Sequence, residues 1–260
     1  MQEETFKDQL HRGATGKSIL FCGAGASLDS INFELNELPS ANPLLGKFNA
    51  HLGKNYTKLP IAAAKMADTS ISDYYKIIID SFTVRNVSDD MISISSFPWS
   101  KIYTTNYDDS VEQSCLKVGK KFQTLTGLHA PKESLDDRLS IIHLHGFINH
   151  FRIDTIRKEC ILDYTSNVAN DVYSGPWATE LKNDIATSDI VVFLGYSLYD
   201  PEIAKIILQG QVSRSKIFFV NSRIVDEELD YMQSQFGTPI NIEKDGFATI
   251  LRSIQLPGIF

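Results

Sequence analysis

Short runs of apolar and β-branched residues recur along the chain, and amphipathic stretches of helical length separate them. Runs of this kind, bounded by Gly, Asn or Ser, are typical of strands buried on both faces of a parallel sheet. The predicted strands lie at residues 18–22, 102–105, 140–144, 189–194, 216–220 and, more weakly, 239–242. The predicted helices between and after them lie at 108–118, 177–187, 201–209, 226–236 and 247–254. This alternation predicts an α/β fold with a doubly wound, Rossmann-like and mostly parallel sheet.

Residues 28–99 do not follow the alternation, because they contain no convincing strand. Their helix-like segments lie at 43–52, 59–67 and 71–82. We interpret this stretch as a helical insertion between the first two strands of the sheet. Residues 147–176 are also irregular and could form a second, smaller cap or lid. Hydrophilic linkers between independent domains are missing, so a single domain over residues 1–260 is expected.

The charge balance excludes some classes of partner. The chain has 260 residues, with 25 Lys and Arg against 32 Asp and Glu, and a formal net charge of -7. This balance argues against a surface that binds nucleic acid or an anionic membrane non-specifically. The longest apolar stretches, 18–26 and 190–196, are too short to span a bilayer, and residues 1–17 do not resemble a signal peptide.

Cysteine use favours a reducing compartment. The three cysteines lie too far apart in the sequence for a CxxC motif, and their number does not suit a disulfide framework. A cytoplasmic location is therefore expected. The residues are Cys22, Cys115 and Cys160.

The first predicted strand leads into a glycine-rich sequence, GAGAS, at residues 23–27. Glycines after a strand let backbone amides approach a pyrophosphate, and the positive end of a following helix adds to the attraction. An ordinary tight turn has the same composition, and the dinucleotide signature GxGxxG is not met because Leu28 takes its last glycine position. The chain has no GxxxxGKS or GxxxxGKT phosphate loop, which disfavours an ordinary NTPase.

Polar residues also follow the second and third predicted strands. Asn106 could orient a water or a ribose hydroxyl, and Asp108 could accept from a carboxamide, but both are equally explained as turn and cap residues. His143 and His145 share one face of the third strand, yet no third ligand at suggestive spacing supports a metal site. His145, at the strand tip before Gly146, is predicted to be a general base with His143 packed beside it.

Two further strand ends carry signatures of the same kind. Gly195 and Ser197 follow the strongest predicted strand and could contact phosphate or ribose, while Asn221 follows the next strand and could hold a ribose. Taken singly, each is more often a turn residue or a helix cap. Five such strand ends at one edge of a sheet are what a dinucleotide bound across the switch in strand order requires.

The motifs GAGAS, TTNYD, HLHG, GYSLYDP and FFVN occur in the order and approximate spacing of those of the Sir2 (sirtuin) superfamily. The chain resembles that family over roughly residues 18–221. The resemblance implies that NAD+ is the substrate and that Asn106 and His145 are the catalytic pair. It also implies an NAD+ site lined by Gly23, Ala24, Gly25, Ser27, Asp108, Gly195, Ser197 and Asn221.

Departures from the family pattern narrow what the resemblance implies. Three cysteines cannot build the four-cysteine zinc ribbon of the family's protein deacylases, the family's GIPDFR segment is missing, and Thr105 replaces the usual glutamine. The variant YTTNYD together with GYSLYDPEI is more similar to the Sir2-like effectors of bacterial anti-phage systems. Those effectors cleave NAD+ and typically act within multi-subunit or multidomain assemblies.

The resemblance therefore implies a cytoplasmic NAD+ hydrolase that uses no metal and releases nicotinamide and ADP-ribose, depleting NAD+ in abortive infection. We expect a homo-oligomer or a separately encoded sensor or activator subunit to gate the activity. An NAD-dependent protein deacylase or ADP-ribosyltransferase on the same fold is one alternative. A non-catalytic module that senses NAD+ or ADP-ribose is another, and a cyclic ADP-ribose product stays open.

Overall fold

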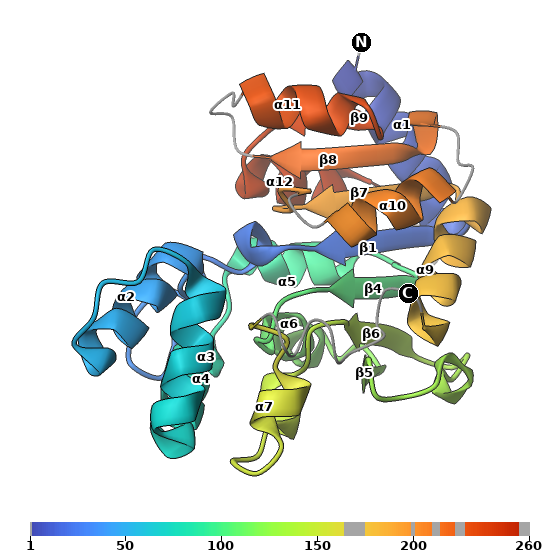
Figure 1. Ribbon diagram of the computed structural model, residues 1–260. Coiled ribbons are helices and arrows are strands. Elements are labelled where there is room, and N and C mark those ends of the chain that lie inside the picture. Colours follow the sequence, from blue (N-terminus) through green and yellow to red (C-terminus); the bar gives the residue numbers. More distant parts are fainter. Residues whose placement is uncertain (1, 164–174, 199–200, 210–213, 222–226, 255–260) are drawn as a thin grey trace.

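The computed structural model describes residues 2–163, 175–198, 201–209, 214–221 and 227–254 (Figure 1). Its central sheet has seven strands in the order β5-β6-β4-β1-β7-β8-β9, and all pairings are parallel. The strand order switches between β1 and β7: β4, β6 and β5 lie on one side of β1, and the later strands β7, β8 and β9 lie on the other. The predicted doubly wound α/β fold is confirmed. The strands are β1 (Ser18–Cys22), β4 (Lys101–Thr104), β5 (Phe122–Thr126), β6 (Leu139–His143), β7 (Ile190–Leu194), β8 (Ile217–Asn221) and β9 (Thr238–Asn241).

All strands predicted from apolar runs are present, and none is displaced by more than one residue at either end. The sequence does not predict β5, which lies at one edge of the sheet. Its sequence, FQTLT, alternates apolar and polar residues, and its first three residues are only half-buried. An edge strand with one covered face needs no continuous apolar run, so the pattern used for the central strands does not detect it.

Helices cover both faces of the sheet (Figure 1). Successive strand residues face opposite sides, so Leu20 packs in the core beneath α1, α5, α6 and α12, while Phe21 packs in the core beneath α9 and α10. The sequence does not predict α1, whose charged stretch buries Phe6 and Leu10 one turn apart. No described helix is long and apolar enough to cross a membrane. The helices around the sheet are α1 (Gln2–Thr15), α5 (Asp89–Ser96), α6 (Ser110–Lys117), α9 (Pro176–Thr187), α10 (Pro201–Gln209), α11 (Glu227–Ser234) and α12 (Lys244–Ser253).

The stretch between β1 and β4 contains a layer of helices beyond the end of the sheet toward which the strand arrows point (Figure 1). Its core, which includes Phe48 and Ile78, is separate from the two sheet cores. Two short strands, β2 (Ile31–Asn32) and β3 (Val84–Asn86), pair antiparallel here, although the sequence predicts no strand, because segments this short show no periodicity. The last helix, α5, packs on the sheet beside α6 and α12. The helical layer consists of α2 (Ala41–Leu52), α3 (Leu59–Thr69) and α4 (Ile71–Phe82).

The irregular stretch after β6 packs on this helical layer. It contains the short helices η3 (Ile148–His150) and α7 (Ile156–Glu159). Phe147 and Phe151 lie in the same core as the side chains of α2, α3 and α4. The stretch expected to form a separate cap and the helical layer therefore share one core over residues 147–163, while residues 164–174 lie outside the described residues.

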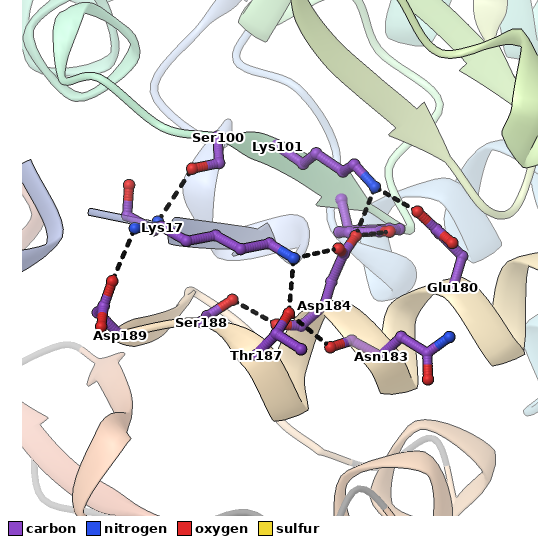
Figure 2. A network of polar contacts seen from close by, with 11 residues as sticks. Lys17, Ser100, Lys101, Glu180, Asn183, Asp184, Thr187, Ser188 and Asp189 are labelled. Carbon is purple, nitrogen blue, oxygen red and sulfur yellow. Dashed lines mark hydrogen bonds and ion pairs between the residues drawn. The ribbon is translucent and has the colours of Figure 1, made fainter. Parts of the chain in front are cut away.

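An ionic network around the buried Asp184 ties the N-terminal ends of the central strands to α9 (Figure 2). Asp184 of α9 accepts from Lys17, just before β1, and from Lys101, the first residue of β4, each at 2.8 Å. The Tyr103 hydroxyl donates to the same carboxylate at 2.6 Å. Burial alone would raise the pKa of Asp184, but the hydrogen bonds from Lys101, Lys17 and Tyr103 outweigh burial and lower it. Asp184 therefore stays ionised and holds two strand starts against one helix.

Asp184→Asn should lower the free energy of unfolding by about 2–4 kcal/mol at pH 7, because Lys17 and the half-buried Lys101 lose the charge of a buried carboxylate that also accepts from Tyr103. Since the folded-state pKa is lowered, the stabilisation is present above the unfolded carboxyl pKa of about 3.9 and is lost as the pH falls through the folded value. Urea unfolding between pH 7 and pH 3 should show wild type and variant converging at acidic pH. Asp136→Asn, at an exposed carboxylate, is the control. Equal stabilities of Asp184→Asn and wild type at pH 7 would contradict this role.

Candidate active site

The strands that precede the predicted site residues all end at one edge of the sheet, because the strands are parallel. Most of these residues are joined by direct hydrogen bonds or line one cleft at that edge. They are Gly23, Ala24, Gly25, Ser27, Asn106, Asp108 and Gly195. His145, Ser197 and Asn221 follow or end strands at the same edge but do not line the cleft.

The backbone segments after β1 and β7 are in contact where the strand order switches. The Gly25 amide donates to the Gly195 carbonyl at 3.0 Å, and Gly195 has φ 59°, which L side chains rarely adopt. A Cβ at Gly23 would lie 2.5 Å from the Gly195 carbonyl oxygen, and a Cβ at Gly25 would lie 2.9 Å from the Gly195 Cα. The packing of two main chains therefore requires glycine at these positions, whether or not a ligand is bound.

Most backbone amides of the glycine-rich loop donate within the protein. The Gly23 amide donates to the Leu194 carbonyl at 2.9 Å, and the amides of Ala26 and Ser27 donate to carbonyls of the loop itself. Together with the Gly25 bond, this uses the donors that the sequence assigns to a pyrophosphate. Among the described residues none accepts from the Ala24 amide, which is therefore the loop donor left for a ligand.

The side chain of Asn106 has one orientation that satisfies its surroundings. Its Nδ2 donates to the Gly23 carbonyl at 2.9 Å and to Ser27 Oγ at 3.1 Å. A carbonyl oxygen can only accept, so the nitrogen must be the atom that faces Gly23. Within the described part of the chain nothing donates to Oδ1, and Asn106 lines the cleft. The Asn106 side chain therefore offers a ligand an acceptor and no donor.

Asp108 anchors the loop between β4 and α6. Its Oδ2 accepts from Ser27 Oγ at 2.9 Å, and its Oδ1 accepts from the Ser110 amide at 3.1 Å. Burial raises the pKa of Asp108, and the hydrogen bonds from Ser110 and Ser27 oppose that shift. The bond to Ser110 is the turn contact that the sequence left as an alternative, and the same carboxylate also joins Ser27 and Asn106 in one chain of hydrogen bonds.

The cleft beside Asn106 is small and mainly apolar. Its volume is about 160 Å³. One wall comes from the strand ends, and the other comes from the helical layer and the segments around it. The sequence marks this second wall only at residues 38–40, which are loosely similar to the family's GIPDFR segment but lack its Asp-Phe-Arg. The lining residues that sequence reasoning does not single out include Leu44, Leu59, Phe82 and Leu162.

His145 leaves β6 beside the point where Asn106 leaves β4. The parallel register pairs Thr104 with His143, and the two predicted catalytic residues lie two positions beyond that pair. His145 is half-buried, and its carbonyl accepts from the Ile161 amide at 3.0 Å. The structure thus places the two residues on neighbouring chain segments, although only Asn106 lines the cleft.

His143 is fully buried and contacts the main chain of Asn106. Its Nδ1 lies 2.8 Å from the Asn106 carbonyl oxygen, and its Nε2 lies 3.0 Å from Glu112 Oε1. Burial alone would lower the pKa of His143, but the Glu112 carboxylate and the bond to Asn106 outweigh burial and raise it. The sequence places His143 only as a packed neighbour of His145 and does not point to Glu112.

Asn221 contacts another side chain of the protein. Its amide group bonds Gln233 of α11, and Gln233 Nε2 also donates to the Tyr196 carbonyl at 3.0 Å. Gln233 is fully buried, so this pair fixes the loop that contains Gly195 and half-buried Ser197. The sequence does not single out Gln233, because nothing in the pattern of α11 distinguishes it from a solvated residue.

The described residues contain no group of three or more His, Cys, Asp or Glu that could hold a metal ion. The cysteines are free and buried, and they lie in different elements. Cys22 ends β1, Cys115 lies in α6, and Cys160 follows α7. Burial raises the pKa of the Cys115 and Cys160 thiols to about 12, so neither is a reactive thiolate at neutral pH.

Residues 100–234 match the protein family described as SIR2-like domain. The match covers more than half of the chain and includes TTNYD, HLHG and GYSLYDP. The chain belongs to the SIR2-like family. Four of the five motifs from which the resemblance was inferred lie within the matched residues, and GAGAS at residues 23–27 lies outside them.

Two curated proteins are similar to this SIR2-like chain. Defense-associated sirtuin 2 of Bacillus subtilis is 23% identical over 258 residues, which cover 89% of the chain and 24% of that protein. NAD(+) hydrolase ThsA of Enterococcus faecium is 25% identical over 209 residues, which cover 74% of the chain and 39% of that protein. The chain therefore spans well under half the length of either relative.

A solved Sir2 structure shares the fold of the SIR2-like chain. That structure is a His-to-Ala variant of Sir2 with a deacetylated p53 peptide and 3'-O-acetyl ADP-ribose. The two chains superpose with a TM-score of 0.55 over 96% of this chain and 97% of the other, at 12% sequence identity. The likeness at this identity supports the Rossmann-like α/β architecture.

Gly195→Ala should lower the free energy of unfolding by at least about 1–3 kcal/mol, because the new Cβ strains a positive φ and meets the loop after β1. Gly46→Ala is the matched control, since Gly46 lies exposed in α2 with nothing near its Cβ position. The control should be neutral or stabilising by about 0.5–1 kcal/mol. Urea unfolding measures both, and a Gly195→Ala variant as stable as Gly46→Ala would refute the packing requirement.

Proposed function

We propose that this SIR2-like chain hydrolyses NAD+ at the bond between nicotinamide and ribose, giving nicotinamide and ADP-ribose. The observation that carries the proposal is the state of Asn106. Both of its amide hydrogens are bound by the protein, and its acceptor oxygen remains at the wall of a small cleft beside the glycine-rich loop. Family membership and the name of the Enterococcus relative, an NAD(+) hydrolase, support the same reaction.

The cleft suits the nicotinamide ring. Its volume of about 160 Å³ is below the roughly 300–1,000 Å³ of pockets that enclose drug-sized ligands, so one ring fits and the rest of the dinucleotide lies outside. Much of the wall is apolar, with Leu38, Leu44 and Phe82 among its residues. Transfer of a charged ring from water to such a wall is unfavourable, whereas a neutral ring is accepted. The wall therefore favours the neutral nicotinamide that cleavage releases.

The reaction needs a positioned water and a base. As the bond breaks, its electron pair goes to the nicotinamide nitrogen, and positive charge develops on the ribose in an oxocarbenium-like state. The oxygen of a water molecule then bonds the ribose carbon, and its proton passes to His145. Asn106 Oδ1 accepts a hydrogen bond from that water or from a ribose hydroxyl and so orients it.

The remaining predicted residues would hold the rest of NAD+. The Ala24 amide is the loop donor left for a phosphate oxygen. Ser197 and Asn221 lie further along the same edge, where a ribose or phosphate outside the cleft would pass. Asp108 acts through Ser27 and Asn106, to which its hydrogen bonds lead. No metal enters this scheme. The cationic nicotinamide ring of NAD+ leaves as neutral nicotinamide, and this departure needs no added Lewis acid.

We also propose that the activity is gated, either in a homo-oligomer or by a separately encoded sensor or activator. Residues 1–260 would form one NAD+-binding domain with its insertion at about 28–99. Uncontrolled NAD+ loss would kill the host cell, so such an enzyme must be held inactive until needed. The Bacillus relative is named a defense-associated sirtuin, which supports a role in defence. We propose that this role is the depletion of cytoplasmic NAD+ during phage infection.

Incubation of the purified protein with NAD+ should yield free ADP-ribose and nicotinamide, resolved by chromatography. Asn106→Ala and His145→Ala should each lower the rate by at least about 100-fold, because each removes a group that acts on the water. His11→Ala, at an exposed side chain of α1, should keep the wild-type rate. O-acetyl-ADP-ribose formed from an acetylated peptide would indicate a deacylase, and NAD+ binding without turnover under any condition, with or without candidate activators, would indicate a sensor. Either result would overturn the proposal.

The gate predicts that the chain alone, as a monomer, turns over NAD+ slowly. Turnover per chain should rise steeply with protein concentration if the active form is an oligomer, or on addition of an activator subunit. Nicotinamide release measured beside light scattering across a concentration series tests this. Full-rate turnover by a monomer at every concentration would contradict the gate and leave the hydrolase proposal intact.

A further inference from the structure

A group of buried polar side chains lies directly behind Asn106. The side chains of His143 and Glu112 are 0% and 6% exposed, and they come from β6 and α6. Glu112 Oε1 contacts His143 Nε2 at 3.0 Å and accepts from the Thr124 hydroxyl of β5 at 2.8 Å. Three elements thus converge on one carboxylate.

The protonation of His143 follows from its partners. Nδ1 faces the Asn106 carbonyl, which can only accept, so Nδ1 carries a hydrogen. Nε2 faces a carboxylate oxygen that already accepts from Thr124, so a proton is shared between His143 and Glu112. The carboxylate holds the ring in the plane that aims Nδ1 at Asn106.

This pair is not explained by stability. A buried ion pair is often no more stabilising than apolar side chains of the same volume, because both charges lose their hydration. Glu112 Oε2 moreover has no partner among the described residues, which adds a further cost. Such a group in a parallel-sheet core therefore calls for a role other than packing.

The bond from His143 completes a three-point hold on Asn106. The Asn106 amide donates to Thr104 Oγ1 at 2.9 Å, the carbonyl accepts from His143, and the side chain donates to Gly23 and Ser27. Without His143 the carbonyl would be buried without a donor, and the peptide between Asn106 and Tyr107 could rotate toward another one. Rotation there would move Oδ1.

We propose that His143 is a positioning residue for NAD+ cleavage: it holds the main-chain carbonyl of Asn106 so that Oδ1 faces the cleft, and Glu112 holds its ring. This rests on the proposed function of Asn106. His143 touches no substrate in this scheme, so its loss should lower kcat and leave KM for NAD+ nearly unchanged.

Two substitutions separate positioning from packing. In His143→Asn, the amide nitrogen takes the place of Nδ1 and can still donate to Asn106, but the contact with Glu112 is lost. In His143→Gln, the amide nitrogen takes the place of Nε2 and still donates to Glu112, but the bond to Asn106 is lost. A packing role predicts that His143→Gln is the better variant, because it leaves no buried carboxylate unpaired.

Positioning predicts the opposite order for catalysis. Turnover of NAD+ by His143→Asn should exceed that by His143→Gln by about 100-fold, the cost of a misplaced reacting group, with equal KM. Urea unfolding should nevertheless rank His143→Gln as the more stable variant. His51→Gln, at an exposed histidine of α2, is the control and should match wild type. Turnover by His143→Gln equal to or above that of His143→Asn would overturn the proposal.

A second measurement keeps this test separate from the reaction itself. Amide hydrogen exchange over residues 104–108 should be faster in His143→Gln than in His143→Asn. If wild type releases no nicotinamide under any condition, at high protein concentration or with candidate activators, the proposed function fails, and the exchange order alone decides whether His143 positions Asn106. Slower or equal exchange in His143→Gln would overturn the positioning role. If wild type turns over NAD+ but His143→Gln is at least as active as His143→Asn, the positioning role is overturned and the proposed function stands.

Discussion

The contact between the main chains after β1 and β7 is the constraint on which the site depends. It requires glycine where the two loops meet, and it fixes the Gly23 carbonyl beside the end of β4. Because that carbonyl can only accept, it binds the nitrogen of the Asn106 amide and leaves the oxygen for the cleft. Glycines that suggest phosphate binding in the sequence therefore also act by setting which atom of Asn106 is available.

The N-terminal and C-terminal ends of the parallel strands carry different kinds of polar group. At the edge where the strands begin, Asp184 and its lysines form a network whose charges are paired, and its effect is on stability. At the edge where the strands end, Asn106 keeps an acceptor and Ala24 keeps a donor. The length of the strands separates these two sites. Groups left for a ligand can therefore gather at the C-terminal ends without weakening the contacts at the N-terminal ends.

The sequence predicts the parts of this fold in which a single residue pattern decides the structure. The runs at β1 and β7 are almost wholly apolar because both faces are buried, and the sequence predicts their bounds to within one residue. The edge strand β5 and the two-residue strand β2 are not found, since neither needs a continuous apolar run. In the candidate site, Asn106 and the glycines can be predicted because they directly follow apolar strands. The partners that orient them depend on tertiary contacts between distant segments, as Glu112 and His143 show.

The wall of the cleft links the helical insertion physically to Asn106. Neighbouring residues Asn106 and Tyr107 belong to different environments: Asn106 contacts the glycine-rich loop, while Tyr107 lies in the core of the helical layer. The Tyr107 hydroxyl donates to the Ile161 carbonyl at 2.7 Å, and its ring packs against Phe82 of α4. A partner that displaced α2, α3 and α4 would therefore act on Asn106 across one peptide bond. The helical layer is therefore a direct physical route from the outside of the molecule to Asn106 for the gating proposed above.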